Sequence, residues 1–281
     1  MTDNKFLFSI QPRDKLLDLR LREIWRYRDL LTLFVRRDFV AYYKQTILGP
    51  AWFFIQPLLT TIVFTIIFGN IAKLSTDGLP PMLFYLAGVT AWNYFSNCLV
   101  KTSDTFTANA NIFGKVYFPR AVVPLSVTIS NLITFGIQFL LFLGFLFYFM
   151  LTGANVTPNW YMLTFPVLIV TMGVMGLSFG LWLSAMTTKY RDFKFLVGFG
   201  VQLLMYATPV IYPISQIPEK YQWAMIANPM TSIIETFRYS FLGSGNMSWA
   251  GLAYSVGFTV VLFLSGLVIF NRTEKNFMDT V

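Results

Sequence analysis

Residues that could perform acid–base, nucleophilic or metal chemistry are scarce in this sequence. Its 281 residues include no histidine and one cysteine, Cys98, which excludes histidine-based catalysis, serine triads and an intrachain disulfide. The 13 acidic residues are scattered, and Asp104, Asp192 and Glu235 are each too isolated to form a catalytic carboxylate pair. No Gly-x-x-x-x-Gly-Lys-Ser/Thr loop is present to bind ATP phosphates. We therefore expect no enzyme, and we expect energy for any work to come from another subunit.

The charged residues lie between six apolar runs that contain no charged side chain. They cover residues 47–70, 82–100, 121–150, 160–186, 195–213 and 249–270. A run of about 18 or more apolar residues can cross ~30 Å of hydrocarbon as an α-helix, which satisfies its own backbone hydrogen bonds. The sequence thus predicts an all-α integral membrane protein with six transmembrane helices. The absence of charge from the runs argues against a proton- or ion-coupled carrier.

Lysine and arginine are distributed unevenly about these runs. When successive connections are assigned to alternate sides, all 21 except Lys73, Lys220 and Arg238 lie on the side of the N-terminus. Cytoplasmic loops are enriched in these residues, so we expect both termini to be cytoplasmic, in an inner or plasma membrane. The net charge of +8 follows from this bias and gives no reason to expect a nucleic-acid partner.

We divide the chain into a cytoplasmic N-terminus (1–46), a six-span domain (47–270) and a cytoplasmic tail (271–281). Within the N-terminus, residues 13–45 place apolar side chains at helical spacing among several arginines. This pattern predicts an amphipathic helix at the membrane interface, with its cations toward anionic lipid. A plain basic anchor explains the pattern better than a specific ligand site does.

Two loops on the cytoplasmic side combine aromatic and charged residues. In the first, 101–120, Ser103 or Asp104 could cap a short helix that ends at Gly114. Five apolar side chains on either side of this glycine are expected to be exposed, either as a docking surface or resting on the membrane: Ile112, Phe113, Val116, Tyr117 and Phe118. The second loop is 187–194.

The outer segment 214–248 is too long for a simple turn. Asn228 followed by Pro229 predicts a helix start, and Gly243 predicts its end. A second short helix is expected over 219–227. At roughly 10–14 residues neither can span, so we expect two re-entrant or periplasmic helices between spans five and six. Glu235 and Arg238 should meet on the helix surface as a structural ion pair.

Several short motifs occur in order between about residues 20 and 245. They are Trp25-Arg26-Tyr27-Arg28-Asp29-Leu30, Val35-Arg36-Arg37-Asp38, Tyr43-Lys44-Gln45-Thr46-Ile47-Leu48-Gly49-Pro50, Gln56-Pro57-Leu58, Lys115-Val116-Tyr117-Phe118-Pro119-Arg120, Lys189-Tyr190-Arg191-Asp192, Ala207-Thr208-Pro209-Val210-Ile211-Tyr212-Pro213, and Asn228-Pro229-Met230 with Glu235-Thr236-Phe237-Arg238. Each alone is weak, but together they specifically resemble the permease subunits of ABC-type polysaccharide exporters.

The resemblance implies a homodimer joined to two cytoplasmic ATPase subunits, which hold ATP and Mg²⁺, with no cofactor in this chain. It implies export of an undecaprenyl diphosphate-linked polysaccharide, O-antigen foremost, across a bacterial inner membrane to the periplasm. The loop after the second span resembles the family's coupling helix, which docks on the ATPase and maps onto Thr105, Asn109, Ile112, Phe113, Lys115 and Tyr117. A smaller contact maps onto Lys189, Tyr190, Arg191 and Asp192. The outer helices resemble a periplasmic gate, with Asn228, Pro229, Glu235 and Arg238.

A polymer longer than the membrane requires a continuous channel, which we expect at the dimer interface. Aromatic faces stack on sugars and uncharged polar groups bind hydroxyls, so the candidate lining residues are Trp52, Phe53, Gln56, Tyr85, Trp92, Tyr94, Gln202, Tyr206 and Tyr212. Packing or an interfacial belt is the alternative role for these aromatic residues. Arg36, Arg37 and Lys44 are the expected contacts of the lipid diphosphate, with anchoring to bulk lipid as the alternative.

Other functions remain open at this stage. The substrate could be teichoic acid, capsule, a drug, a peptide or a small lipid, and a non-transporting membrane scaffold is a remote alternative. The arginine-rich interface helix and the outer helix pair favour a lipid-diphosphate polymer. Co-purification with an ATPase would separate a transporter from a scaffold.

Overall fold

The computed structural model describes residues 21–44 and 46–276, and every regular element in these ranges is helical. In chain order the elements are α1 (Leu21–Arg26), α2 (Arg28–Tyr43), η1 (Gly49–Ala51), α3 (Trp52–Phe64), the π-helix η2 (Thr65–Ile71), α4 (Pro81–Ser103), α5 (Thr105–Ala108), α6 (Ala110–Phe113), α7 (Val122–Leu151), η3 (Trp160–Thr164), α8 (Phe165–Lys189), α9 (Phe193–Tyr206), η4 (Ile214–Gln216), α10 (Glu219–Ala227), α11 (Pro229–Leu242) and α12 (Trp249–Asn276). The predicted all-helical class is confirmed over the described residues.

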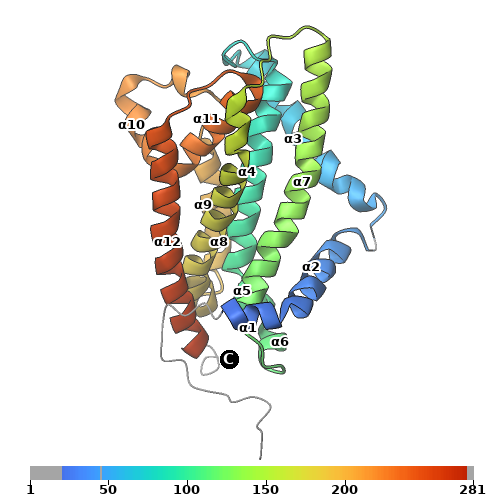
Figure 1. Cartoon of the computed structure of the whole chain (residues 1–281), viewed down its shortest axis with the longest axis vertical. Helices are drawn as coiled ribbons and strands as arrows, with labels where there is room; N and C mark the ends of the chain where they lie inside the picture. Colours follow the sequence, from blue (N-terminus) through green and yellow to red (C-terminus); the bar gives the residue numbers. More distant parts are fainter. Residues whose placement is uncertain (1–20, 45, 277–281) are drawn as a thin grey trace, which may run out of the picture.

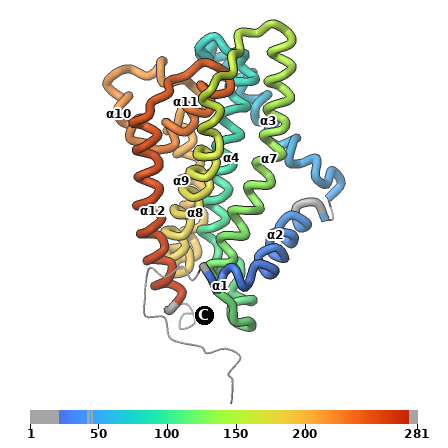
Figure 2. Tube along the Cα trace, viewed as in Figure 1, coloured from blue at the N-terminus to red at the C-terminus, as the bar shows by residue number. Residues whose placement is uncertain are grey.

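The long helices α4, α7, α8 and α12 run side by side along the long axis of the molecule (Figures 1 and 2). One end of the bundle carries α1, α2, α5 and α6, together with the loop that joins α8 to α9. We call this the basic end, because its loops contain Lys115, Arg120 and Arg191. The opposite end carries α10 and α11.

Four segments are long and apolar enough to cross a membrane. They are Gly49–Ile71, Val122–Leu151, Trp160–Lys189 and Trp249–Glu274, and they coincide with four of the six predicted runs. The run 82–100 forms α4, a helix of 23 residues that is buried in the middle of the bundle. The helices thus have the lengths and the polarity of a membrane protein, with α4 as the central helix.

The run 195–213 is a helix over only part of its length. Helix α9 ends at Tyr206, and residues 207–213 have no regular helix, so the prediction of one span through 213 is wrong. Pro209 and Pro213 account for the difference, because proline donates no backbone hydrogen bond and disfavours a helical residue before it. Val197 is the one buried residue of α9, so this helix packs loosely on the rest of the chain.

Close helix packing fixes the position of α4. A Cβ added to Gly176 of α8 would lie 2.6 Å from the carbonyl oxygen of Phe95 and 2.8 Å from Cβ of Cys98, both on α4. Small residues allow membrane helices to approach at this distance, where dispersion contacts between backbones stabilise the pair. On the other face of α8, Gly266 of α12 makes a similar approach to the carbonyl oxygen of Ser178.

The predicted amphipathic helix is present as two helices rather than one. Tyr27 separates α1 from α2, and residues 13–20 of the prediction lie outside the described residues. Ile24 and Phe34 are buried in an apolar cluster against the base of α7, whereas Arg22 and Arg36 are exposed. This division of apolar and charged faces suits a helix pair lying along the membrane surface.

The two short helices at the opposite end follow their sequence signals closely. Asn228 precedes α11, and its side-chain oxygen accepts a hydrogen bond from the Met230 backbone N–H at 3.0 Å. Pro229 occupies the first helical position, and Gly243 ends the helix with φ of 77°. Helix α10 begins at Glu219, as predicted. Both the caps and the extent of these helices are therefore confirmed.

Candidate functional site at the basic end

The loop after α4 forms two short helical turns rather than one capped helix. Helices α5 and α6 meet at Asn109, whose side-chain amide donates to the Thr105 carbonyl oxygen at 3.0 Å. The predicted end at Gly114 is confirmed. The predicted side-chain cap is wrong, because Ser103 Oγ donates to the Val100 carbonyl oxygen and Asp104 makes no capping hydrogen bond.

The apolar side chains of this loop divide into a buried and an exposed group. Val116 and Tyr117 are 58% and 67% exposed, as expected of a docking surface. The expected exposure of Phe113 and Phe118 is wrong, because both pack in the apolar cluster that includes Phe106. They stabilise the loop from beneath and leave Val116 and Tyr117 at its tip.

Arg120, at the end of the loop, joins the loop to α12. Its guanidinium lies 5.4 Å from the Phe113 ring centroid and donates to the Glu274 carbonyl oxygen of α12 at 2.8 Å. Burial lowers the pKa of this guanidinium, while the nearby Tyr117 raises it. Arginine nevertheless remains protonated in proteins, so these contacts persist across physiological pH.

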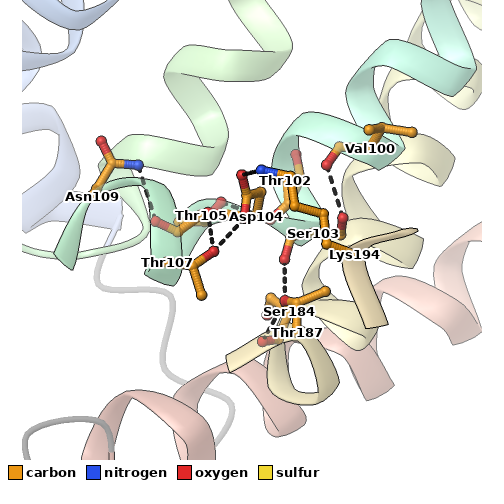
Figure 3. A network of polar contacts seen from close by, with 10 residues as sticks. All are labelled: Val100, Thr102, Ser103, Asp104, Thr105, Thr107, Asn109, Ser184, Thr187 and Lys194. Carbon is orange, nitrogen blue, oxygen red and sulfur yellow. Dashed lines mark hydrogen bonds and ion pairs between the residues drawn. The ribbon is translucent and has the colours of Figure 1, made fainter. Parts of the chain in front are cut away.

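Hydrogen bonds and an ion pair join the two cytoplasmic-loop candidates into one unit (Figure 3). The Thr187 hydroxyl of α8 donates to the Ser103 carbonyl oxygen. Lys194, in the first turn of α9, forms an ion pair with Asp104. The four predicted contact residues between them are exposed: Lys189, Tyr190, Arg191 and Asp192. The two predicted contact regions are therefore physically connected, although they are far apart in sequence.

A cavity of about 550 Å³, which we call the basal cavity, opens beside this network. Its walls come from α2, α3, α4, α7 and the first turn of α9, with the loop 104–112. The charged lining residues are the cations Arg37, Lys101 and Lys194 and the carboxylates Asp38 and Asp104, and the amide residues are Asn109 and Asn131. Three cations against two carboxylates give the cavity a net positive charge, which favours an anionic occupant.

Of the three cations predicted to bind a diphosphate, the structure places only Arg37 on the cavity wall. Its guanidinium pairs with Asp38 at 2.9 Å, and its charge lies 4.7 Å above the Phe34 ring centroid. Arg36 and Lys44 are exposed, outside the cavity lining. The role of these two residues stays a prediction.

Sequence reasoning missed three residues of the cavity: Lys101, Lys194 and Asn131. The Lys101 ammonium donates to the Asn131 side-chain oxygen at 3.2 Å. Two signals could have found them. Lys101 and Lys194 directly flank apolar runs, where a cation lies at the membrane surface. Asn131 is an amide inside a long apolar run, where a polar side chain usually has a partner.

The candidate channel residues fall into two groups. Trp52, Gln56, Gln202 and Tyr206 are exposed on α3 and α9. Four of the others are buried inside the chain: Phe53, Tyr85, Trp92 and Tyr94. Tyr212 is half-buried, and its hydroxyl donates to the Tyr206 carbonyl oxygen. The structure therefore brings the first group, but not the enclosed residues, to a surface that another chain could face.

The candidate gate residues lie at the opposite end of the bundle, around Arg238. Glu235 and Arg238 pair as predicted, at 3.6 Å, but both are buried rather than on the helix surface. The guanidinium also donates to the carbonyl oxygens of Pro209 and Val210, at 2.5 and 2.6 Å. Arg238 thus ties α11 to the irregular segment that follows α9.

Comparisons with known proteins show which family the chain belongs to. The family model described as "ABC-2 type transporter" matches residues 29–242. The chain is 30% identical over 258 residues to the O-antigen export system permease protein RfbA of Klebsiella pneumoniae, covering 89% of this chain and 94% of that one.

More distant relatives extend the same comparison. A Myxococcus xanthus protein, also described as O-antigen export system permease protein RfbA, is 28% identical over 265 residues, or 93% and 98% of the two chains. The polysialic acid transport protein KpsM of Escherichia coli is 20% identical over 231 residues, or 81% and 87%. With most of its length matched by the family model and its helices built to cross a membrane, this multi-pass protein belongs to the ABC-2 type transporter family, as a permease of the polysaccharide-exporting kind.

Proposed function

We propose that this protein is the permease of an ATP-driven exporter that moves an undecaprenyl diphosphate-linked polysaccharide, most specifically O-antigen, from the cytoplasm to the periplasm. The higher identity to O-antigen permeases than to the polysialic acid protein supports this substrate. ATP and Mg²⁺ bind to two separate ATPase subunits, and the two termini and the basic end face the cytoplasm. Six membrane segments per protomer include α4 and the segment 193–213, in which the 14-residue α9 is followed by an irregular stretch.

The observation that carries the proposal is the pair of exposed apolar residues at the tip of the first loop. Val116 and Tyr117 project beyond a base of buried aromatic rings. An ATPase that binds this tip would push on a loop joined to α4, α8 and α9 through Ser103, Thr187 and the Asp104–Lys194 pair. The energy of hydrolysis would therefore enter at one place and reach three helices.

A channel between two copies of the chain fits the exposed faces of α3 and α9. Tyr206 and Gln202 lie on a helix whose neighbours cover little of it, so a second protomer can face them. Trp52 and Gln56 present an aromatic ring and an amide on α3. These four residues are the lining candidates that we retain for contact with sugar rings and hydroxyls.

Deleting the gene and complementing the strain with Tyr117→Glu tests the function. We expect deletion to leave lipid-linked polymer inside the cell and to remove it from the surface, and wild type to restore export. Tyr117→Glu should not restore it, because a buried charge at an interface weakens ATPase binding. Loss of an anchoring tyrosine costs about 2 kcal/mol, or roughly thirtyfold in affinity.

The control for this experiment is Tyr221→Glu, which changes an exposed tyrosine of α10 at the opposite end. Membrane level and co-purification of the ATPase are measured for each variant. Normal surface glycan in the deletion strain would contradict the proposed function. Normal ATPase binding by Tyr117→Glu would instead contradict the assigned docking tip.

The Asp104–Lys194 pair gives a second test, by exchange of charge. Because the lysine is about half exposed, we expect Lys194→Asp to change the free energy of unfolding by no more than about 1 kcal/mol, whereas Asp104→Lys should cost more because the aspartate side chain is 18% exposed. Export should nevertheless fall in both, because like charges would separate α9 from the loop. The double exchange should recover export. If the two single variants and the double variant all exported equally, the ion pair would have no part in coupling.

A further inference from the structure

An apolar groove lies between α3 and α7, and α9 contributes no residue to its lining. It has a volume of about 490 Å³ and is lined by Phe54, Leu140, Leu141, Gly144, Phe145 and Tyr148. A Cβ added to Gly144 would meet no atom within 4 Å, so this glycine leaves open space in the groove wall. The lining has almost no hydrogen-bonding groups, which suits a hydrocarbon occupant.

The groove and the basal cavity lie on the same two helices. Phe53 lines the cavity and the next residue, Phe54, lines the groove. On α7 the cavity includes Asn131 and Thr134, and the groove begins at Leu140. With 1.5 Å per residue, Asn131 to Tyr148 covers about 25 Å along the helix, most of a hydrocarbon layer of ~30 Å. The cationic cavity and the apolar groove thus succeed one another along α7, from the basic end into its apolar stretch.

We propose that the basal cavity and this groove form one binding site for a polyprenyl diphosphate lipid, with the diphosphate in the cavity and the chain along α7. The inference rests on the proposed function, since the lipid is the anchor of the exported glycan. Arg37, Lys101 and Lys194 are the headgroup contacts, and Asn131 holds the Lys101 ammonium toward the cavity.

The charges of the cavity favour a diphosphate over a phospholipid. Arg37 is paired with Asp38, and Lys194 is paired with Asp104. An incoming headgroup must compete with these carboxylates. A diphosphate carries more negative charge than the single phosphodiester of a bulk lipid, and it offers more acceptor oxygens to several cations at once.

Binding at this site would also change the loop network. If the diphosphate takes Lys194 from Asp104, it loosens the ion pair that joins α9 to the loop carrying Tyr117. An occupied cavity would therefore alter the surface that meets the ATPase. This gives a physical route by which arrival of the lipid could stimulate ATP hydrolysis.

The headgroup is tested with the permease–ATPase complex in phosphatidylcholine nanodiscs. The probe is a photoreactive polyprenyl diphosphate, with polyprenol, phosphatidylglycerol and inorganic diphosphate as separate competitors. We expect crosslinks to peptides of α3 and α7. Lys101→Met and Arg37→Met should each weaken probe binding about tenfold or more, as expected for loss of a charged hydrogen-bond partner. The matched control is Arg272→Met, which removes an exposed cation at the same end.

The tail is tested by filling the groove. Gly144→Leu should reduce binding of both the polyprenyl diphosphate and polyprenol, whereas inorganic diphosphate binding stays unchanged. Gly136→Leu is the control, because Gly136 is on the same helix, also has no atom within 4 Å of an added Cβ, and does not line the groove. Surface display of glycan should follow probe binding in the two variants.

Three outcomes would overturn the proposal. Equal competition by phosphatidylglycerol would make this a general anionic lipid site, and unchanged probe binding in Gly144→Leu and Lys101→Met would place the lipid elsewhere. A disulfide between two Gly144→Cys protomers would mean that a second copy covers the groove. In each case the deletion phenotype still reports on export, so failure of this site and failure of the proposed function are distinguishable.

Discussion

Replacing Arg238 with alanine should destabilise the protein by about 3–5 kcal/mol, the usual cost of removing one partner from a buried ion pair. The cost arises because Glu235 would keep a buried carboxylate without its cation, and two backbone carbonyl oxygens would lose their donor. The guanidinium also lies 3.6 Å from the Phe84 ring centroid, so packing on α4 would be lost as well. We expect a lower melting temperature and less protein in the membrane.

Thermal unfolding of the purified permease in detergent, followed by tryptophan fluorescence, measures this effect. Arg272→Ala is the control, since it removes an exposed cation. The double variant Arg238→Met with Glu235→Gln should recover part of the loss, because no unpaired charge remains buried. A melting temperature for Arg238→Ala within error of the Arg272→Ala control would show that the buried pair does not hold the outer end together.

Gly176→Leu should cost about 3 kcal/mol or more, at the upper end of the range for overpacking. The first added atom would lie 2.6 Å from a backbone oxygen of α4, which cannot move aside as a side chain can. Helices α4 and α8 would have to separate along their shared face. Because both helices lead into the loops that we propose as ATPase contacts, we expect export to fail together with stability.

Gly257→Leu is the matched substitution, since Gly257 is on the membrane-crossing α12 and an added Cβ there meets no atom within 4 Å. Melting temperature and dimer yield are measured for both variants. If Gly176→Leu behaved like Gly257→Leu, the close approach of α4 and α8 would not be a determinant of the fold.

Local signals in the sequence predicted the fold well where local physics decides the structure. Asn228, Pro229 and Gly243 act on backbone groups a few residues away, so their roles were readable without tertiary information. The burial of Phe113 was not readable, because its ring partners Phe106 and Phe118 are in the same loop and are themselves covered by the distant rings of Phe270 and Phe34. The early end of α9 was signalled by Pro209 and Pro213, but the uncharged run around them dominated the prediction.

The candidate site was predicted only in part, for a related reason. Arg37 was found because it precedes a membrane run, but the cavity that it lines also needs Lys101, Lys194 and Asn131 from three other helices. Only the packing of α2 and α4 against α7, and of α9 against α4, brings these residues together. A single sequence identifies which side chains lie near the membrane surface, but not which of them share a cavity.

The continuity of α4 has a mechanical consequence. This helix runs unbroken for 23 residues, about 35 Å. Near one end it meets Arg238 through Phe84, and at the other it leads into Asp104. A stiff helix that is held by contacts at both ends transmits a displacement of one end to the other. If the proposed ATPase tilts the end of α4 at Asp104, the end that packs on Arg238 moves at the same time.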